Sequence, residues 1–143
     1  MKGTILEFTK KDNSFCIKKH TKYGTFTGKV VLHPEDKDVA SDYVGFQFAE
    51  QKCDIQAYHV KTHWMLERAK GAEHAYNVIL KSGVDPEDEI MVKLEQQVNV
   101  AWREYVRTKE VYQNLKESYL AWVAFIQESR RRVRQWEKNK KYD

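Results

Sequence analysis

An unbroken heptad pattern in the C-terminal half constrains this chain more than any other feature. Fourteen positions, spaced alternately by three and four residues from Met91 to Trp136, carry apolar or aromatic side chains at all but two places. This spacing puts the fourteen side chains on one face of a helix, as in coiled coils. It predicts a helix over residues 86–141. The seam positions are Met91, Leu94, Val98, Ala101, Tyr105, Thr108, Tyr112, Leu115, Tyr119, Trp122, Ile126, Ser129, Val133 and Trp136.

An earlier stripe with the same spacing predicts a first helix over residues 41–82. It runs from Phe48 to Ile79 and ends at Ser82-Gly83, where glycine can adopt the left-handed conformation of a helix C-terminus. Ser41 or Asp42 is suited to cap its start. Asp85 followed by Pro86 is a start signal for the second helix. The connection is so short that the helices must form an antiparallel hairpin, with Phe48 opposite about Tyr119.

The N-terminal residues have the alternation and turn residues of a β-meander. Strands are expected at Thr4–Thr9, Ser14–His20 and Thr25–Leu32, and residues 33–38 break the pattern. Three short strands are marginally stable unless a helix covers them. We therefore expect an α+β fold in which a three-stranded antiparallel sheet packs on a long helical hairpin. The β-meander (1–40) and the hairpin (41–143) would form one integrated domain.

The segment Leu120–Ile126 is apolar on every side, although it lies within a helix. Such a segment has to be covered all round. The sheet and the first helix can cover part of it, and we expect a second copy of the chain to cover the rest. The chain is accordingly expected to be a homo-oligomer, a dimer or a multiple of dimers. The alternative is a monomer in which the sheet suffices.

Composition narrows the functional classes. No run of 18 apolar residues is present and the N-terminus lacks a signal-like apolar stretch, so we expect no membrane partner. Cys16 and Cys53 are the only cysteines and lack a CxxC spacing, which favours reduced thiols and a cytoplasmic location.

No residue pattern indicates catalysis. The chain has no glycine-rich phosphate loop, nucleophile elbow or recognisable carboxylate pair. His59 and His63 are spaced as metal ligands on a helix, but Val60 stands where zinc hydrolases have glutamate and no third ligand is evident. We therefore expect neither an enzyme nor a metal or other cofactor.

Arginines of the second helix are the best candidates for ligand binding. Arg130 and Arg134 lie one turn apart on one face with Arg131 adjacent, and Arg103 begins a similar pair earlier in the helix. Two guanidinium groups on one face can grip a phosphate or stack on a base. The alternative is that they are solvated charges, since residues 128–143 carry seven bases against three acids at a helix C-terminus.

Two resemblances bear on function. The stretch Phe26-Thr27-Gly28-Lys29, then His33-Pro34-Glu35-Asp36, then Gly45, Ala49 and Lys52, is similar to double-stranded-RNA-binding-like folds of bacteriophage proteins. The plan of a sheet with two long helices resembles the phage Thoeris anti-defence sponges. That resemblance implies sequestration of a cyclic ADP-ribose-type immune signal without turnover, in the host cytoplasm. The resemblance also implies that Arg130 and Arg134 would match the arginines of the last helix with which that family holds the nucleotide.

Two other classes stay open. A nucleic-acid-binding phage protein would use the basic segments Lys18-Lys19-His20 and Arg130–Lys141 along a phosphate backbone. A structural or partner-inhibiting coiled-coil protein needs only the heptads.

Overall fold

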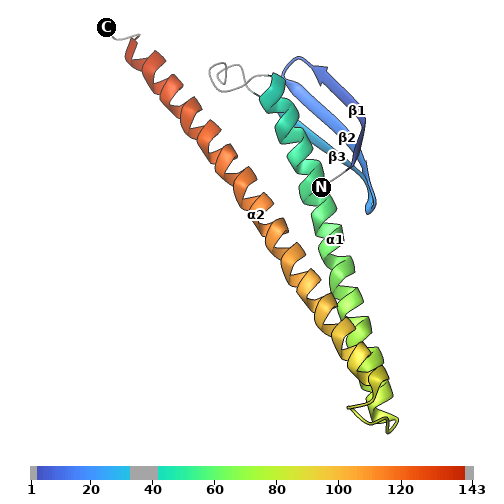
Figure 1. Cartoon of the computed structure of the whole chain (residues 1–143). Helices are drawn as coiled ribbons and strands as arrows, with labels where there is room; N and C mark the ends of the chain where they lie inside the picture. The colour runs from blue at the N-terminus through green and yellow to red at the C-terminus, as the bar shows by residue number, and fades with distance from the viewer. Residues whose placement is uncertain (1–2, 33–41, 141–143) are drawn as a thin grey trace. The chain divides into compact units, whose positions relative to one another are not determined.

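A computed structural model describes residues 3–32 and 42–140. The elements in chain order are β1 (Thr4–Lys11), β2 (Ser14–Thr21), β3 (Gly24–Val31), α1 (Asp42–Lys81) and α2 (Glu89–Lys140) (Figure 1). The expected α+β fold, with its three-stranded antiparallel sheet and helical hairpin, is confirmed. The proposed cap at Ser41 and the break at residues 33–38 lie outside the described residues.

The chain divides into two compact units, which are described one at a time. The first comprises Met1–Ala57 with Asn114–Asp143, and the second comprises Tyr58–Gln113. The sheet belongs to the first unit, together with the start of α1 and the end of α2.

The sheet is an antiparallel meander in the order β1-β2-β3. Phe15 pairs with Val30 and Ile17 pairs with Gly28, while a bulge interrupts the β1–β2 register between Ile5 and Glu7. Along β2, every second residue is buried, and these four residues form its inner face: Phe15, Ile17, Lys19 and Thr21. This alternation is the mark of a sheet with one covered face.

Small residues let α1 approach the sheet closely. Gly45, Ala49, Cys53 and Ala57 recur every four residues on α1, and all four are buried. A Cβ atom on Gly45 would lie 2.6 Å from the Phe15 ring. A Cβ atom on Gly28 of β3 would overlap the backbone carbonyl of Ala49. The missing side chains therefore set the distance between helix and sheet in the first unit.

The core of the first unit joins the sheet to both helices. Its buried members are Phe15, Ile17, Leu32, Phe48, Ala49, Cys53 and Ile126. The ring of Phe48 meets those of Tyr119 and Trp122 edge-on, with centroids 5.7 and 5.9 Å apart. The expected pairing of Phe48 with Tyr119 is thus confirmed.

The second unit is a two-helix hairpin along the predicted seams. Ala69 of α1 and Met91, Ala101 and Thr108 of α2 are its buried side chains. The ring centroids of His59 and Tyr112 lie 5.5 Å apart, which shows that the two helices pair across the seam. At the end of α1, Gly83 has a φ of 97°, as expected of a residue that ends a helix.

The predicted start of the second helix at Pro86 is wrong, because α2 begins at Glu89. Asp85 caps a turn instead: its side chain accepts a hydrogen bond from the Glu87 amide, and its carbonyl accepts one from Asp88. Pro86 occupies the second position of this turn, where its fixed φ is favourable. Asp88 is the N-cap, since its Oδ1 accepts from the Ile90 amide at 3.0 Å.

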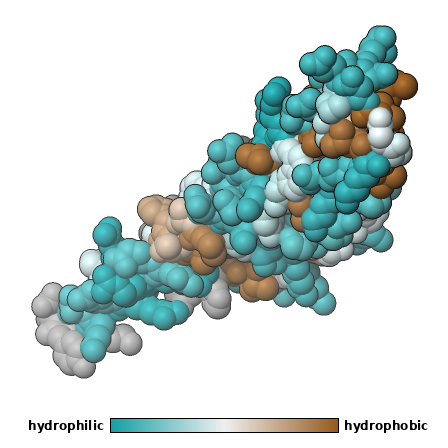
Figure 2. Space-filling model, turned by 90° about the horizontal axis from the view of Figure 1, so that it is seen from below, coloured by the Kyte–Doolittle hydropathy of each residue, from teal (hydrophilic) through white to brown (hydrophobic). Residues whose placement is uncertain are grey.

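The apolar segment of α2 is only partly covered within the described residues. Ile126 is buried, but Leu120, Trp122 and Phe125 are 59%, 42% and 53% exposed. On the face of the molecule drawn in Figure 2, hydrophobic residues lie at the surface among hydrophilic ones. No helix in the described part of the chain is long and apolar enough to cross a membrane.

Candidate functional site

A cleft of about 190 Å³ opens in the first unit, where the end of β3 meets α1 and α2. Its walls are mostly apolar, with Phe48 of α1 and Ile126 of α2 at the core side. The lining residues are Val30, Val31, Leu32, Phe48, Lys52, Tyr119, Val123, Ile126, Gln127 and Arg130. An apolar hollow with a few polar groups is the usual form of a small-molecule site.

Two cations from different helices line this cleft. Lys52 of α1 donates a hydrogen bond to the Lys29 carbonyl at 2.9 Å, and its Nζ lies 5.9 Å from the centroid of the Tyr119 ring. Arg130 of α2 is half-buried. A ligand with a flat or apolar part and a negatively charged part would match this combination.

The structure separates the four arginines proposed as ligand-binding. Arg130 lines the cleft, and Arg134 is exposed one turn further along α2. Arg131 donates two hydrogen bonds to Glu128, at 3.1 and 2.8 Å. Arg103 is exposed in the second unit.

The Arg131–Glu128 pair shifts the pKa values of both side chains. The hydrogen bond from Arg131, helped by Arg132, lowers the pKa of Glu128, and the same bond raises the pKa of Arg131. One carboxylate therefore offsets part of the charge in the basic terminal segment of α2.

Lys52 is the cleft residue that charge patterning missed. It belongs to no cluster of basic residues, and only the resemblance to phage folds singles it out. A signal was nevertheless present: Lys52 lies four residues after Phe48 and three before Ile55, at the border of the apolar stripe. A long side chain at such a border can lay its stem on the core and keep its ammonium group at the surface.

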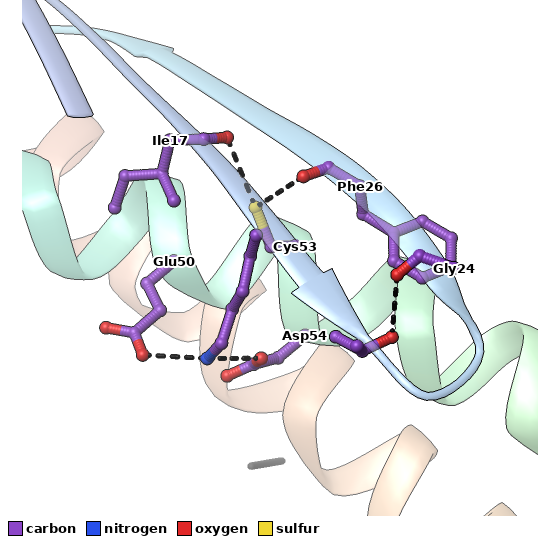
Figure 3. A network of polar contacts seen from close by, with 8 residues as sticks. Ile17, Gly24, Phe26, Glu50, Cys53 and Asp54 are labelled. Atoms are coloured by element: carbon purple, nitrogen blue, oxygen red, sulfur yellow. Dashed lines mark hydrogen bonds and ion pairs between the residues drawn. The ribbon is translucent and has the colours of Figure 1, made fainter. Parts of the chain in front are cut away.

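Lys19 does not contribute to a surface basic patch, contrary to the nucleic-acid hypothesis. It is 3% exposed, and its Nζ lies 2.9 Å from Glu50 and 3.1 Å from Asp54 of α1. In Figure 3, dashed lines mark these two contacts with the carboxylates of Glu50 and Asp54. Of the basic segment Lys18-Lys19-His20, only Lys18 and His20 are exposed.

The thiol of Cys53, the residue before Asp54, is part of the core. Cys53 is buried, and its sulfur lies 3.4 Å from the Ile17 carbonyl and 3.5 Å from the Phe26 carbonyl, to which it donates (Figure 3). Burial raises the pKa of this thiol, which disfavours the reactive thiolate. Across residues 3–32 and 42–140, no three His, Cys, Asp or Glu side chains are grouped so as to hold a metal ion.

Comparison with known proteins adds no relative: no family model, curated protein or solved structure matches this chain.

Proposed function

We propose that this protein binds a small phosphate-bearing nucleotide in the Lys52–Arg130 cleft and does not convert it. The observation that carries the proposal is the pairing of an apolar hollow with two cations from different helices. The volume of about 190 Å³ is below the range typical of whole drug-sized ligands. A base or similar ring would enter the hollow, and the phosphate would remain at its mouth.

Each side chain then has a distinct role. Tyr119, against which the buried Phe48 ring packs, offers aromatic surface to the ring of the ligand, and the guanidinium of Arg130 offers two parallel donors to a phosphate. Lys52 adds a point charge. Arg134 follows Arg130 by one helical turn and would contact a second charged group of a larger ligand.

In biological terms, the proposal is that of a phage-type anti-defence protein that sequesters a cyclic ADP-ribose-like signal in the host cytoplasm. It is supported by the resemblance in plan to the Thoeris sponges and by the Arg130–Arg134 pair. We further propose that it acts as a homo-oligomer. Stoichiometric capture without turnover needs no catalytic group, only affinity and abundance.

We expect the double change Lys52→Ala with Arg130→Ala to weaken nucleotide binding by about a hundredfold or more. Each charge-assisted hydrogen bond contributes roughly 1.5–3 kcal/mol, and about 1.4 kcal/mol corresponds to a tenfold change in affinity. Isothermal calorimetry with cyclic ADP-ribose measures the loss. Lys109→Ala is the matched control, because Lys109 is an exposed cation of α2 in the second unit.

The same titration with mixed-sequence oligonucleotides at two salt concentrations tests the competing class. A nucleic-acid binder would bind all sequences with a steep salt dependence, reduced by about one phosphate contact for each cation removed. If the unmutated protein binds neither cyclic nucleotides nor oligonucleotides, both proposals fail and the structural coiled-coil class is left.

A further inference from the structure

The heptad seam of α2 continues past the point where α1 begins. In the first unit, Phe48 lies between Tyr119 and Trp122, so that the antiparallel α1 places its first residue, Asp42, level with about residue 127 of α2. Residues 128–140 of α2 extend beyond it by about 20 Å, at 1.5 Å per residue. Over this length no residue of α1 covers the seam, yet Ser129, Val133 and Trp136 keep its phase.

Mostly apolar side chains form a stripe that runs from residue 122 into this part of α2. We call Trp122, Phe125, Ser129, Val133 and Trp136 the terminal stripe; at 100° per residue they lie within about 80° of helix surface. Trp122, Phe125 and Trp136 are 42%, 53% and 61% exposed, and the Trp122 and Phe125 rings meet edge-on at 5.9 Å. A helix end that is only solvated does not need apolar side chains at heptad spacing.

We propose that the terminal stripe is the self-association surface, on which the same stripe of a second copy packs antiparallel. Continuity points to a second copy as the occupant, because the seam that matches the α1–α2 interface up to residue 126 goes on with the same repeat, and a second copy carries a helix with that repeat. An antiparallel pair centred on Ser129 sets Trp122 of one copy beside Trp136 of the other. The inference rests on the proposed self-association and does not depend on the ligand.

Charge selects the antiparallel orientation. Residues 114–128 carry one lysine against two glutamates, a net charge of −1, whereas residues 129–140 carry six bases against one glutamate, a net charge of +5. A parallel pair would align two segments of +5. The antiparallel pair sets each basic segment against the weakly acidic segment of the partner, which removes this repulsion.

The double variant Phe125→Glu with Trp136→Glu tests the surface. Neither side chain belongs to the core cluster of the first unit, so the fold should persist, as circular dichroism can verify. Leu120→Glu is the matched control: Leu120 is 59% exposed but lies outside the stripe, on another side of α2. Sedimentation equilibrium at about 100 µM, in the range of weak dimers, should give twice 17.0 kDa for the unmutated protein and the control.

For the double variant, the same measurement should give the 17.0 kDa of one chain. A monomeric unmutated protein would overturn the proposal, and so would a double variant that stays dimeric. Calorimetry on the monomeric variant keeps the two proposals apart, since nucleotide binding in the cleft should survive the loss of the dimer.

Orientation is tested by a spin label on Lys138→Cys in a Cys16→Ser background, with Cys53 protected by burial. Lys138 lies nine residues past Ser129, so antiparallel copies separate the two labelled backbone positions by about 27 Å. Parallel copies would hold them about 10 Å apart. Dipolar electron paramagnetic resonance distinguishes these distances, and the short one would overturn the antiparallel arrangement.

Discussion

Replacing Gly28 by alanine is expected to lower the free energy of unfolding by about 3 kcal/mol or more. The added Cβ would overlap the Ala49 carbonyl, and the Cβ of Lys52 already lies 3.1 Å from its position. Backbone cannot yield as the end of a flexible side chain can, so α1 would have to move away from β3. Such a shift opens the contact between helix and sheet, at the upper end of the usual cost of overpacking. Urea denaturation followed by circular dichroism measures the loss.

Gly71→Ala is the matched control for this prediction. A Cβ on Gly71 meets nothing within 4 Å, and the residue lies inside α1. Alanine there should raise stability by up to about 1 kcal/mol, because it favours the helix. If both substitutions had the same small effect, close approach at Gly28 would not be what holds α1 on the sheet.

The substitution Lys19→Met should cost about 3 kcal/mol of stability at neutral pH. Methionine fills a similar volume but leaves Glu50 and Asp54 without the ammonium that lies between them. Asp54 is only 15% exposed, so its charge cannot be fully hydrated in place. Removing one partner of a buried ion pair is strongly destabilising for this reason. Exchange of an exposed lysine of the same strand, Lys18→Met, is the control and should have little effect.

The Lys19 contribution should also disappear at high pH. Burial lowers the pKa of Lys19, but hydrogen bonds and charges from Glu50 and Asp54 outweigh it, so that the pKa is raised above its ordinary value of 10.5. The stabilisation is therefore complete below pH 10.5 and is lost as the pH rises through the higher pKa of the folded state. The difference in stability between the unmutated protein and Lys19→Met should shrink above pH 10.5. A difference independent of pH would contradict the ion-pair explanation.

Periodicity by itself determined the helical part of this protein. The fourteen seam positions of α2 include its buried side chains Met91, Ala101, Thr108 and Ile126. The short connection also sufficed to place Phe48 opposite Tyr119. These predictions are confirmed because both features work over short stretches of sequence. Heptad spacing sets which face of each helix is apolar, and the short connection sets which residues of the two helices lie opposite each other. The predicted start of α2 was wrong because two residues, Asp85 and Asp88, are both able to cap a helix. Only the geometry of the turn makes Asp88 the N-cap.

Only the tertiary structure decided which polar groups lie together. In the sequence, Lys19 belongs to a basic run, which predicts an exposed charge. In the structure, the pleat of β2 turns Lys19 inward, where it lies against Glu50 and Asp54 of α1. Lys52 and Arg130 are 78 residues apart and share a cleft because both helices pack against the end of β3. Spacing along the chain reports which side chains share a face of one element. Which faces meet depends on how closely small residues such as Gly28 and Ala49 let those elements approach, and that contact is made between distant parts of the sequence.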